Sequence, residues 1–141
     1  VLQLARALAD HVEAADLGEI LIAPTDVVLD ADRPVVLQPD LLFVARERSS
    51  IVQDRVYGAP DLVIEVLSPH PRVGRLDRHV QEYARAGVRE IWVVTQNARS
   101  IDVLACERGR LVVRTTCARS EAIRSQVLPD LDLRVDRLAG W

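Results

Sequence analysis

The sequence contains no lysine, and all 18 of its basic residues are arginine. Any mechanism that needs a lysine amine from this chain is therefore excluded, because the guanidinium of arginine does not deprotonate in proteins. The 21 acidic residues give a formal net charge of −3. A charge of this sign provides no global attraction to nucleic acid or to anionic membranes, so phosphate binding would require a local basic surface.

Cysteine is also scarce, with only Cys106 and Cys117 among 141 residues. Residues 100–106 and 110–117 are predicted to form a hairpin, which places Cys106 near Arg110 and far from Cys117. A disulfide between the two cysteines would be strained or impossible. We therefore expect two reduced thiols and a cytoplasmic location.

Long apolar runs and secretory signals are missing as well. No span of 18 apolar residues and no signal-peptide core occurs, so we expect neither a membrane anchor nor secretion. The chain begins at Val1 without a methionine, and we expect that an upstream segment was removed or was never present. The length is sufficient for a buried core, and we predict one domain over residues 1–141.

The pattern of apolar residues predicts a mixed α/β fold. Residues 1–16 and 72–87 have the three- and four-residue spacing of amphipathic helices, and Gly87 ends the second of them. Strands are expected at 19–22, 26–29, 38–45, 61–67, 89–94, 100–106 and 110–117. We expect a loop with a short helix over 46–59. Near the C-terminus we expect a short strand, a turn at Pro129–Asp130 and then a final strand or helical turn. This order favours helices that cover a central mixed sheet, with antiparallel strands toward the C-terminus.

Glu65 is unusual because it lies within the otherwise apolar run 62–67. An ionised carboxylate inside a strand that is buried on both faces costs several kcal/mol unless a cation, a metal ion or hydrogen-bond donors meet it. Two explanations are open: Glu65 is a metal ligand, or it is a structural carboxylate paired with a buried arginine.

Two further carboxylates open buried strands. Asp61 begins the strand of Glu65, and strand alternation puts both on one face. Asp40 begins the preceding buried run, so Asp40 and Glu65 can converge on one ion if the two strands are neighbours, with Asp61 as a third ligand. Carboxylate oxygens suit Mg²⁺ or Mn²⁺. The alternative for Asp40 and Asp61 is local turn or capping chemistry, because each follows a proline.

Three sequence blocks resemble a known family. "QPDLLFVA" (38–45), "GAPDLVIEVLSP" (58–69) and "YARAGVREIWVV" (83–94) are, in this order, similar to the Uma-two family of restriction endonucleases, within the PD-(D/E)xK nuclease superfamily. The resemblance implies a restriction-endonuclease-like core and a Mg²⁺- or Mn²⁺-dependent endonuclease that hydrolyses DNA phosphodiester bonds. It also implies a homodimer, because cutting both strands needs two sites. The family's usual N-terminal segment is expected to be missing before Val1.

The resemblance also assigns roles to individual residues. Asp40 and Glu65 match the family's acidic positions, and Asp61 matches the aspartate that opens the second acidic strand. The position of the family's lysine, four residues before Tyr83, holds His79 in this chain. A histidine there can act as a neutral base or as an imidazolium.

Arginines near the start of the second predicted helix suit phosphate contacts. These are Arg72, Arg75 and Arg78, and a solvated helix face is the other reading of the same residues. Tyr83 and Trp92 are predicted to be core residues.

A second functional class remains open. The chain can be a catalytically degenerate family member that serves as a binding or assembly module, since it lacks a lysine. A small-molecule hydrolase is not supported, because the sequence offers no Ser-centred glycine elbow and no Cys/His pair.

Overall fold

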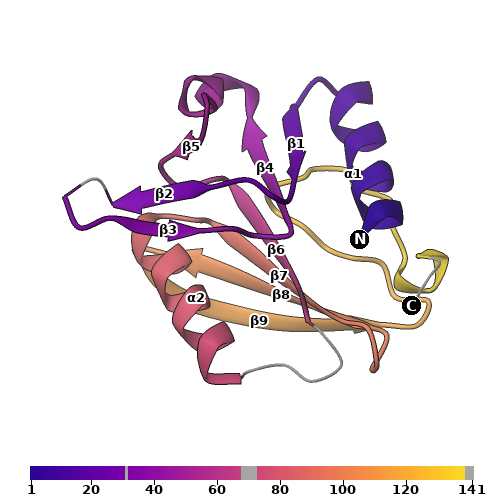
Figure 1. Cartoon of the computed structure of the whole chain (residues 1–141). Coiled ribbons are helices and arrows are strands. Elements are labelled where there is room, and N and C mark those ends of the chain that lie inside the picture. Colours follow the sequence, from indigo (N-terminus) through magenta and orange to yellow (C-terminus); the bar gives the residue numbers. More distant parts are fainter. Residues whose placement is uncertain (31, 68–72, 139–141) are drawn as a thin grey trace.

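The computed structural model describes residues 1–30, 32–67 and 73–138. Figure 1 shows a large twisted sheet with helix α1 (Leu2–Ala14) on one side and helix α2 (Val73–Ala86) on the other. The strands are β1 (Gly18–Ile22), β2 (Val27–Asp30), β3 (Val35–Leu37), β4 (Leu41–Ala45), β5 (Val56–Tyr57), β6 (Leu62–Leu67), β7 (Glu90–Thr95), β8 (Ser100–Glu107) and β9 (Arg110–Ala118). Two short 3₁₀ helices, η1 (Arg46–Ile51) and η2 (Val135–Arg137), complete the described elements. The predicted mixed α/β architecture is confirmed.

The main sheet has six strands in the order β1-β4-β6-β7-β8-β9. Strands β6 and β7 are parallel, because α2 forms the crossover between them, and the other neighbours are antiparallel. A smaller sheet, in the order β3-β2-β5, packs through Val27 and Val56 against Leu42 and Val44 of β4. This packing places the small sheet on one face of β4.

Strand alternation sorts the side chains of β6 onto the two faces. Leu62 and Ile64 belong to the core cluster that includes α1, whereas Val63 belongs to the cluster that includes Tyr83 of α2. Glu65, two residues after Val63, therefore points to the α2 face.

Both helices follow the predicted pattern. Leu4, Leu8 and Val12 are buried along one stripe of α1, as their spacing requires. Helix α2 ends at Ala86, and Gly87 follows with φ of 107°, a left-handed conformation that glycine adopts without steric cost.

Two expectations about irregular segments need correction. The stretch 46–59 contains the expected short helix, η1, but it also contains the strand β5, which was not expected. The short strand expected near the C-terminus is reduced to one isolated bridge between Ala122 and Arg134, and the chain then forms the helical turn η2. Neither short segment has enough alternating residues to give a readable signal.

The two cysteines lie in the predicted hairpin, where Cys106 pairs with Leu111 and Cys117 with Ile101. Cys106 and Cys117 are free and buried in different core clusters, on opposite faces of the β8–β9 hairpin. Burial raises the pKa of both thiols. Within the described ranges, no helix has the length and apolar character needed to cross a bilayer.

The C-terminal segment is attached to the sheet through Glu90, a buried carboxylate at the start of β7. It accepts hydrogen bonds from Trp92 Nε1 at 2.9 Å, from Ser125 Oγ at 2.5 Å and from the backbone N–H of Gln126 at 3.0 Å. Three donors meet the buried charge, which explains how a carboxylate is tolerated at 2% exposure.

Glu90→Gln is expected to lower the free energy of unfolding by about 1–2 kcal/mol. The NH₂ group of the new amide would face the hydrogen-bond donors that now bind the carboxylate, so at least one hydrogen bond would be lost. Urea unfolding measures this loss of stability. Glu107→Gln, at the exposed end of β8, is the matched control and should stay within about 0.5 kcal/mol of wild type. Equal unfolding curves for both variants would show that the three hydrogen bonds contribute nothing net.

Candidate functional site

Asp40 and Glu65 lie side by side on one face of the main sheet. The antiparallel register pairs Leu41 with Ile64 and Leu42 with Val63, so its continuation sets Asp40 opposite Glu65. Asp40 Oδ2 accepts a hydrogen bond of 2.7 Å from the backbone N–H of Val66. Asp40 lies just before β4 begins, and its carboxylate accepts a hydrogen bond from a backbone N–H of β6. This contact holds the carboxylate beside β6.

Glu65 is half-buried, and its described partner is a tyrosine. Tyr83 Oη donates a hydrogen bond of 2.8 Å to Glu65 Oε1. The pKa of Glu65 is raised to about 7, mainly by burial and also by the nearby negative charge of Asp40, while the Tyr83 hydrogen bond and the charge of Arg75 lower it. The carboxyl therefore titrates near neutral pH, and its ionised form gains from any cation that joins the pair.

One stripe of α2 faces this pair of carboxylates. Arg75, His79 and Tyr83 follow one another at four-residue steps, which puts them on the same side of the helix. The ring centroids of His79 and Tyr83 are 6.4 Å apart in an edge-to-face arrangement. Burial lowers the pKa of His79, and the charges of Arg75 and Arg78 lower it further, so the imidazole is biased toward its neutral form.

Tyr83 remains a proton donor. It is fully buried, and burial together with the charge of Glu65 raises its pKa far above the ordinary value. Sequence reasoning treated Tyr83 and Trp92 only as core residues, yet each donates a hydrogen bond to a carboxylate on the sheet. The available signal was the polar atom of each ring, since a buried tyrosine or tryptophan needs an acceptor.

Asp61 lies at the other end of β6, and its described contacts are structural. Its side chain accepts a hydrogen bond of 2.7 Å from the backbone N–H of Ala45 and forms ion pairs with Arg89 at 3.0 Å and Arg48 at 3.2 Å. Four residues of strand separate it from Glu65, a span of roughly 13 Å that one ion does not bridge. That Asp61 shares a metal ion with Glu65 stays a prediction. The distance between the two residues along the strand disfavours it.

The arginines expected to bind phosphate divide into described and undescribed residues. Arg75 and Arg78 are exposed on α2, with Arg75 on the stripe that faces Glu65. Arg72 lies outside the described residues. In the described ranges, no arginine forms an ion pair with Asp40 or Glu65, so the alternative of Glu65 paired with a buried arginine is not observed there.

The acidic pair of Asp40 and Glu65 suits a small divalent cation that takes most of its ligands from water and substrate. Among the described residues, no group of three or more His, Cys, Asp or Glu side chains is arranged to hold a metal ion. Mg²⁺ and Mn²⁺ do not require such a cage, because they commonly bind through one or two carboxylates and complete their shell with water and substrate phosphate. Two adjacent carboxylates meet this requirement.

Comparisons with known proteins give a family and a similar crystal structure, and both are described as nucleases. A family model described as "Uma2: Putative restriction endonuclease" matches residues 1–136. A crystal structure of a protein from Anabaena variabilis, described as "a putative nuclease belonging to DUF820", superposes with a TM-score of 0.79 at 15% sequence identity. The match covers 96% of this chain and 75% of the other, and at this identity it establishes the fold. Curated proteins gave no match.

Proposed function

We propose that this chain, which belongs to the Uma2 family of restriction-endonuclease-like proteins, is a nuclease that hydrolyses DNA phosphodiester bonds with Mg²⁺ or Mn²⁺ held by Asp40 and Glu65. The single observation that carries the proposal is the pair itself. Two carboxylates from neighbouring strands lie on one face, and the half-buried one has a pKa raised to about 7. A protein gains nothing in stability from such repulsion, so a function that recruits a cation explains it best.

The residues around the pair have separate roles in this proposal. Asp40 and Glu65 would hold the ion, which when bound supplies positive charge to the phosphodiester and lowers the pKa of a coordinated water. Tyr83 orients the Glu65 carboxylate through its hydrogen bond. His79, biased toward the neutral form, has a lone pair that can accept a proton from the attacking water. Arg75 is placed to contact a phosphate.

Cleavage of supercoiled plasmid DNA in the presence of Mn²⁺ tests the proposal. Wild type should nick the plasmid, and chelation by EDTA should stop the reaction. His79→Ala should lower the rate by about a hundredfold, the contribution expected of a general base. His11→Ala, on α1 at the opposite face of the sheet, is the matched control and should cleave like wild type. A wild-type preparation with no metal-dependent nicking would overturn the proposal.

A degenerate binding or assembly module is the second candidate, and the absence of lysine favours it. The variant His79→Lys places an ammonium at the position where the family resemblance implies one. If wild type binds DNA without cutting it and His79→Lys cuts, the chain has the architecture of a nuclease and has lost one catalytic group. If wild type cuts and His79→Lys is no better, the histidine suffices and the degenerate alternative is rejected.

A further inference from the structure

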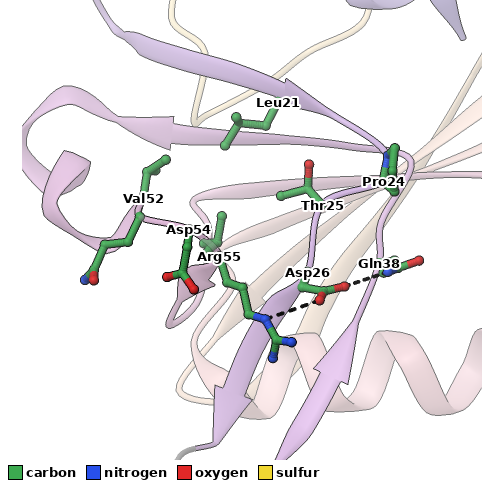
Figure 2. A pocket seen from close by; sticks show the side chains of 10 residues that line it. Leu21, Pro24, Thr25, Asp26, Gln38, Val52, Asp54 and Arg55 are labelled. Atoms are coloured by element: carbon green, nitrogen blue, oxygen red, sulfur yellow. Dashed lines mark hydrogen bonds and ion pairs between the residues drawn. The ribbon is translucent and has the colours of Figure 1, made fainter.

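A polar pocket is lined in part by Gln38, in the segment that leads to Asp40 and β4. Its volume is about 430 Å³, within the range of small-ligand sites. Figure 2 shows side chains that line it, which come from the end of β1 and the β1–β2 connection, from the residue before Pro39, and from the start of β5 and the segment that leads into it. They are Leu21, Pro24, Thr25, Asp26, Gln38, Val52, Gln53, Asp54, Arg55 and Val56.

The pocket lies on the same face of the main sheet as the acidic pair. Leu21 pairs with Leu42 across β1 and β4, and both pack in the cluster that joins the small sheet to β4. The backbone N–H of Ala23 donates a hydrogen bond of 2.9 Å to the carbonyl of Asp40, which ties the pocket's first segment to a proposed metal ligand. Gln38 precedes Asp40 by two residues, a separation of at most about 7 Å along the chain.

The polar side chains of the pocket are arranged around Asp26. One carboxylate oxygen accepts a 2.5 Å hydrogen bond from Gln38 Nε2, and the other forms an ion pair with Arg55 Nε at 3.4 Å. Figure 2 marks both interactions with dashed lines. Nε is directed at Asp26, and no other described residue forms an ion pair with Arg55, so its two terminal nitrogens form a planar fork of donors. Asp54 stands on the same short segment and keeps a second carboxylate oxygen beside the one that accepts from Tyr57 at 3.0 Å.

This donor and acceptor pattern matches one nucleobase better than the others. Guanine presents two neighbouring acceptors, N7 and O6, which an arginine fork binds bidentately, and its amino group is a donor for a carboxylate. Adenine is usually read by a bidentate amide. The Nε2 atom of Gln38 already donates to Asp26, and that of Gln53 donates to the carbonyl of Ser50. Leu21, Val52 and Pro24 offer apolar surface against which a base can pack.

We propose that this pocket receives a guanine base of the DNA strand whose phosphate lies at the Asp40–Glu65 pair, with Arg55 reading the base edge. The inference rests on the proposed function, because it uses the acidic pair as the position of the phosphate. It makes the small sheet a recognition element rather than only a cover for β4. The protein would then cut with a base preference next to the cleaved bond.

Equilibrium binding without metal tests the pocket independently of cleavage. The probe is a fluorescent strand of nine thymidines whose central base is replaced by guanine, adenine or cytosine, measured by anisotropy in EDTA. Wild type should bind the guanine strand about tenfold more tightly than the all-thymine strand, the discrimination of one bidentate contact. Arg55→Ala should remove this difference. Arg6→Ala, an exposed arginine on α1 at the opposite face, is the matched control and should retain it.

The outcomes separate the two proposals. Equal affinity of wild type for all four strands, or a guanine preference that survives Arg55→Ala, would overturn the base pocket. A guanine preference that requires Arg55, in a protein that shows no Mn²⁺-dependent cleavage, supports the pocket and rejects the nuclease. Asp54→Asn gives a second test. It preserves the size of an exposed side chain and weakens the acceptance of a hydrogen bond from the guanine amino group, so it should reduce the guanine preference.

Discussion

Glu65→Gln is expected to weaken Mn²⁺ binding by about a hundredfold or more and to reduce DNA cleavage to the metal-free rate. The amide is nearly the same size as the carboxylate and can still accept the hydrogen bond from Tyr83, so the packing against α2 should persist. What is lost is one of two negative charges at the proposed cation site. Calorimetric titration with Mn²⁺, combined with plasmid cleavage, measures both effects.

The affinity of the wild type for Mn²⁺ should also depend on the ionisation of Glu65, and therefore on pH. Because the pKa of Glu65 is raised to about 7, protons compete with the cation below that pH. Competition by one proton predicts that the apparent affinity for Mn²⁺ falls roughly fiftyfold from pH 7 to pH 5. Tyr83→Phe should move the onset of this loss to higher pH, since the hydrogen bond from Tyr83 lowers the pKa of Glu65.

The matched control is Glu13→Gln, which removes an exposed carboxylate of α1 on the other side of the sheet. It should bind Mn²⁺ with the affinity and pH profile of wild type. A titration in which Glu65→Gln equals Glu13→Gln, or a wild-type affinity that does not change between pH 5 and pH 7, would remove Glu65 from the metal site.

The metal-free protein should show the opposite trend in folding stability. The pKa of Glu65 is about 7 when folded and about 4.5 in the ordinary state, so the folded form binds more protons between these values. The contribution of this group is therefore fully present below about pH 4.5 and is lost as the pH rises toward about 7. Saturating Mn²⁺ should reverse the loss, because the bound cation favours the ionised carboxylate.

The sequence was most informative where a local pattern is strong. The helical spacing of Leu4, Leu8 and Val12 indicates the buried side of α1, and the length and β-branched residues of the apolar run around Ile64 indicate β6. The strand pairing that brings Asp40 beside Glu65 is non-local, so the residues alone gave it only as a condition, and the family resemblance favoured it. Short elements such as β5 have two paired residues, too few for a period to be read.

The chemistry of the acids depended on partners distant in sequence. Glu65 lies within β6 and Asp61 directly precedes it, and the local sequence does not tell which of the two is paired with arginine. Arg89 approaches Asp61 from the α2–β7 connection, and Tyr83 approaches Glu65 from the third turn of α2, so tertiary structure decides which acid is neutralised. Glu90 was overlooked for the same reason, since two of its donors come from Ser125 and Gln126.

Asp61→Ala is expected to lower the free energy of unfolding by about 3 kcal/mol, the largest stability effect among the carboxylates. The substitution leaves the buried N–H of Ala45 without its acceptor and removes the common partner of Arg48 and Arg89. These two arginine side chains are 38% and 57% exposed, so they can turn to water, and this keeps the loss below that of a fully buried pair. Thermal unfolding should show a midpoint about 10 °C lower.

A comparison with Asp61→Asn separates structure from metal binding. The asparagine oxygen can still accept from Ala45, so this variant should recover part of the stability while it lacks the charge that attracts Arg89. If Asp61 acts through these contacts, Asp61→Asn binds Mn²⁺ like wild type, and Arg89→Ala combined with Asp61→Ala costs less than the sum of the single changes. If Asp61→Asn instead loses Mn²⁺ affinity with no change in melting, Asp61 is a metal ligand and the separation of roughly 13 Å from Glu65 would have to close.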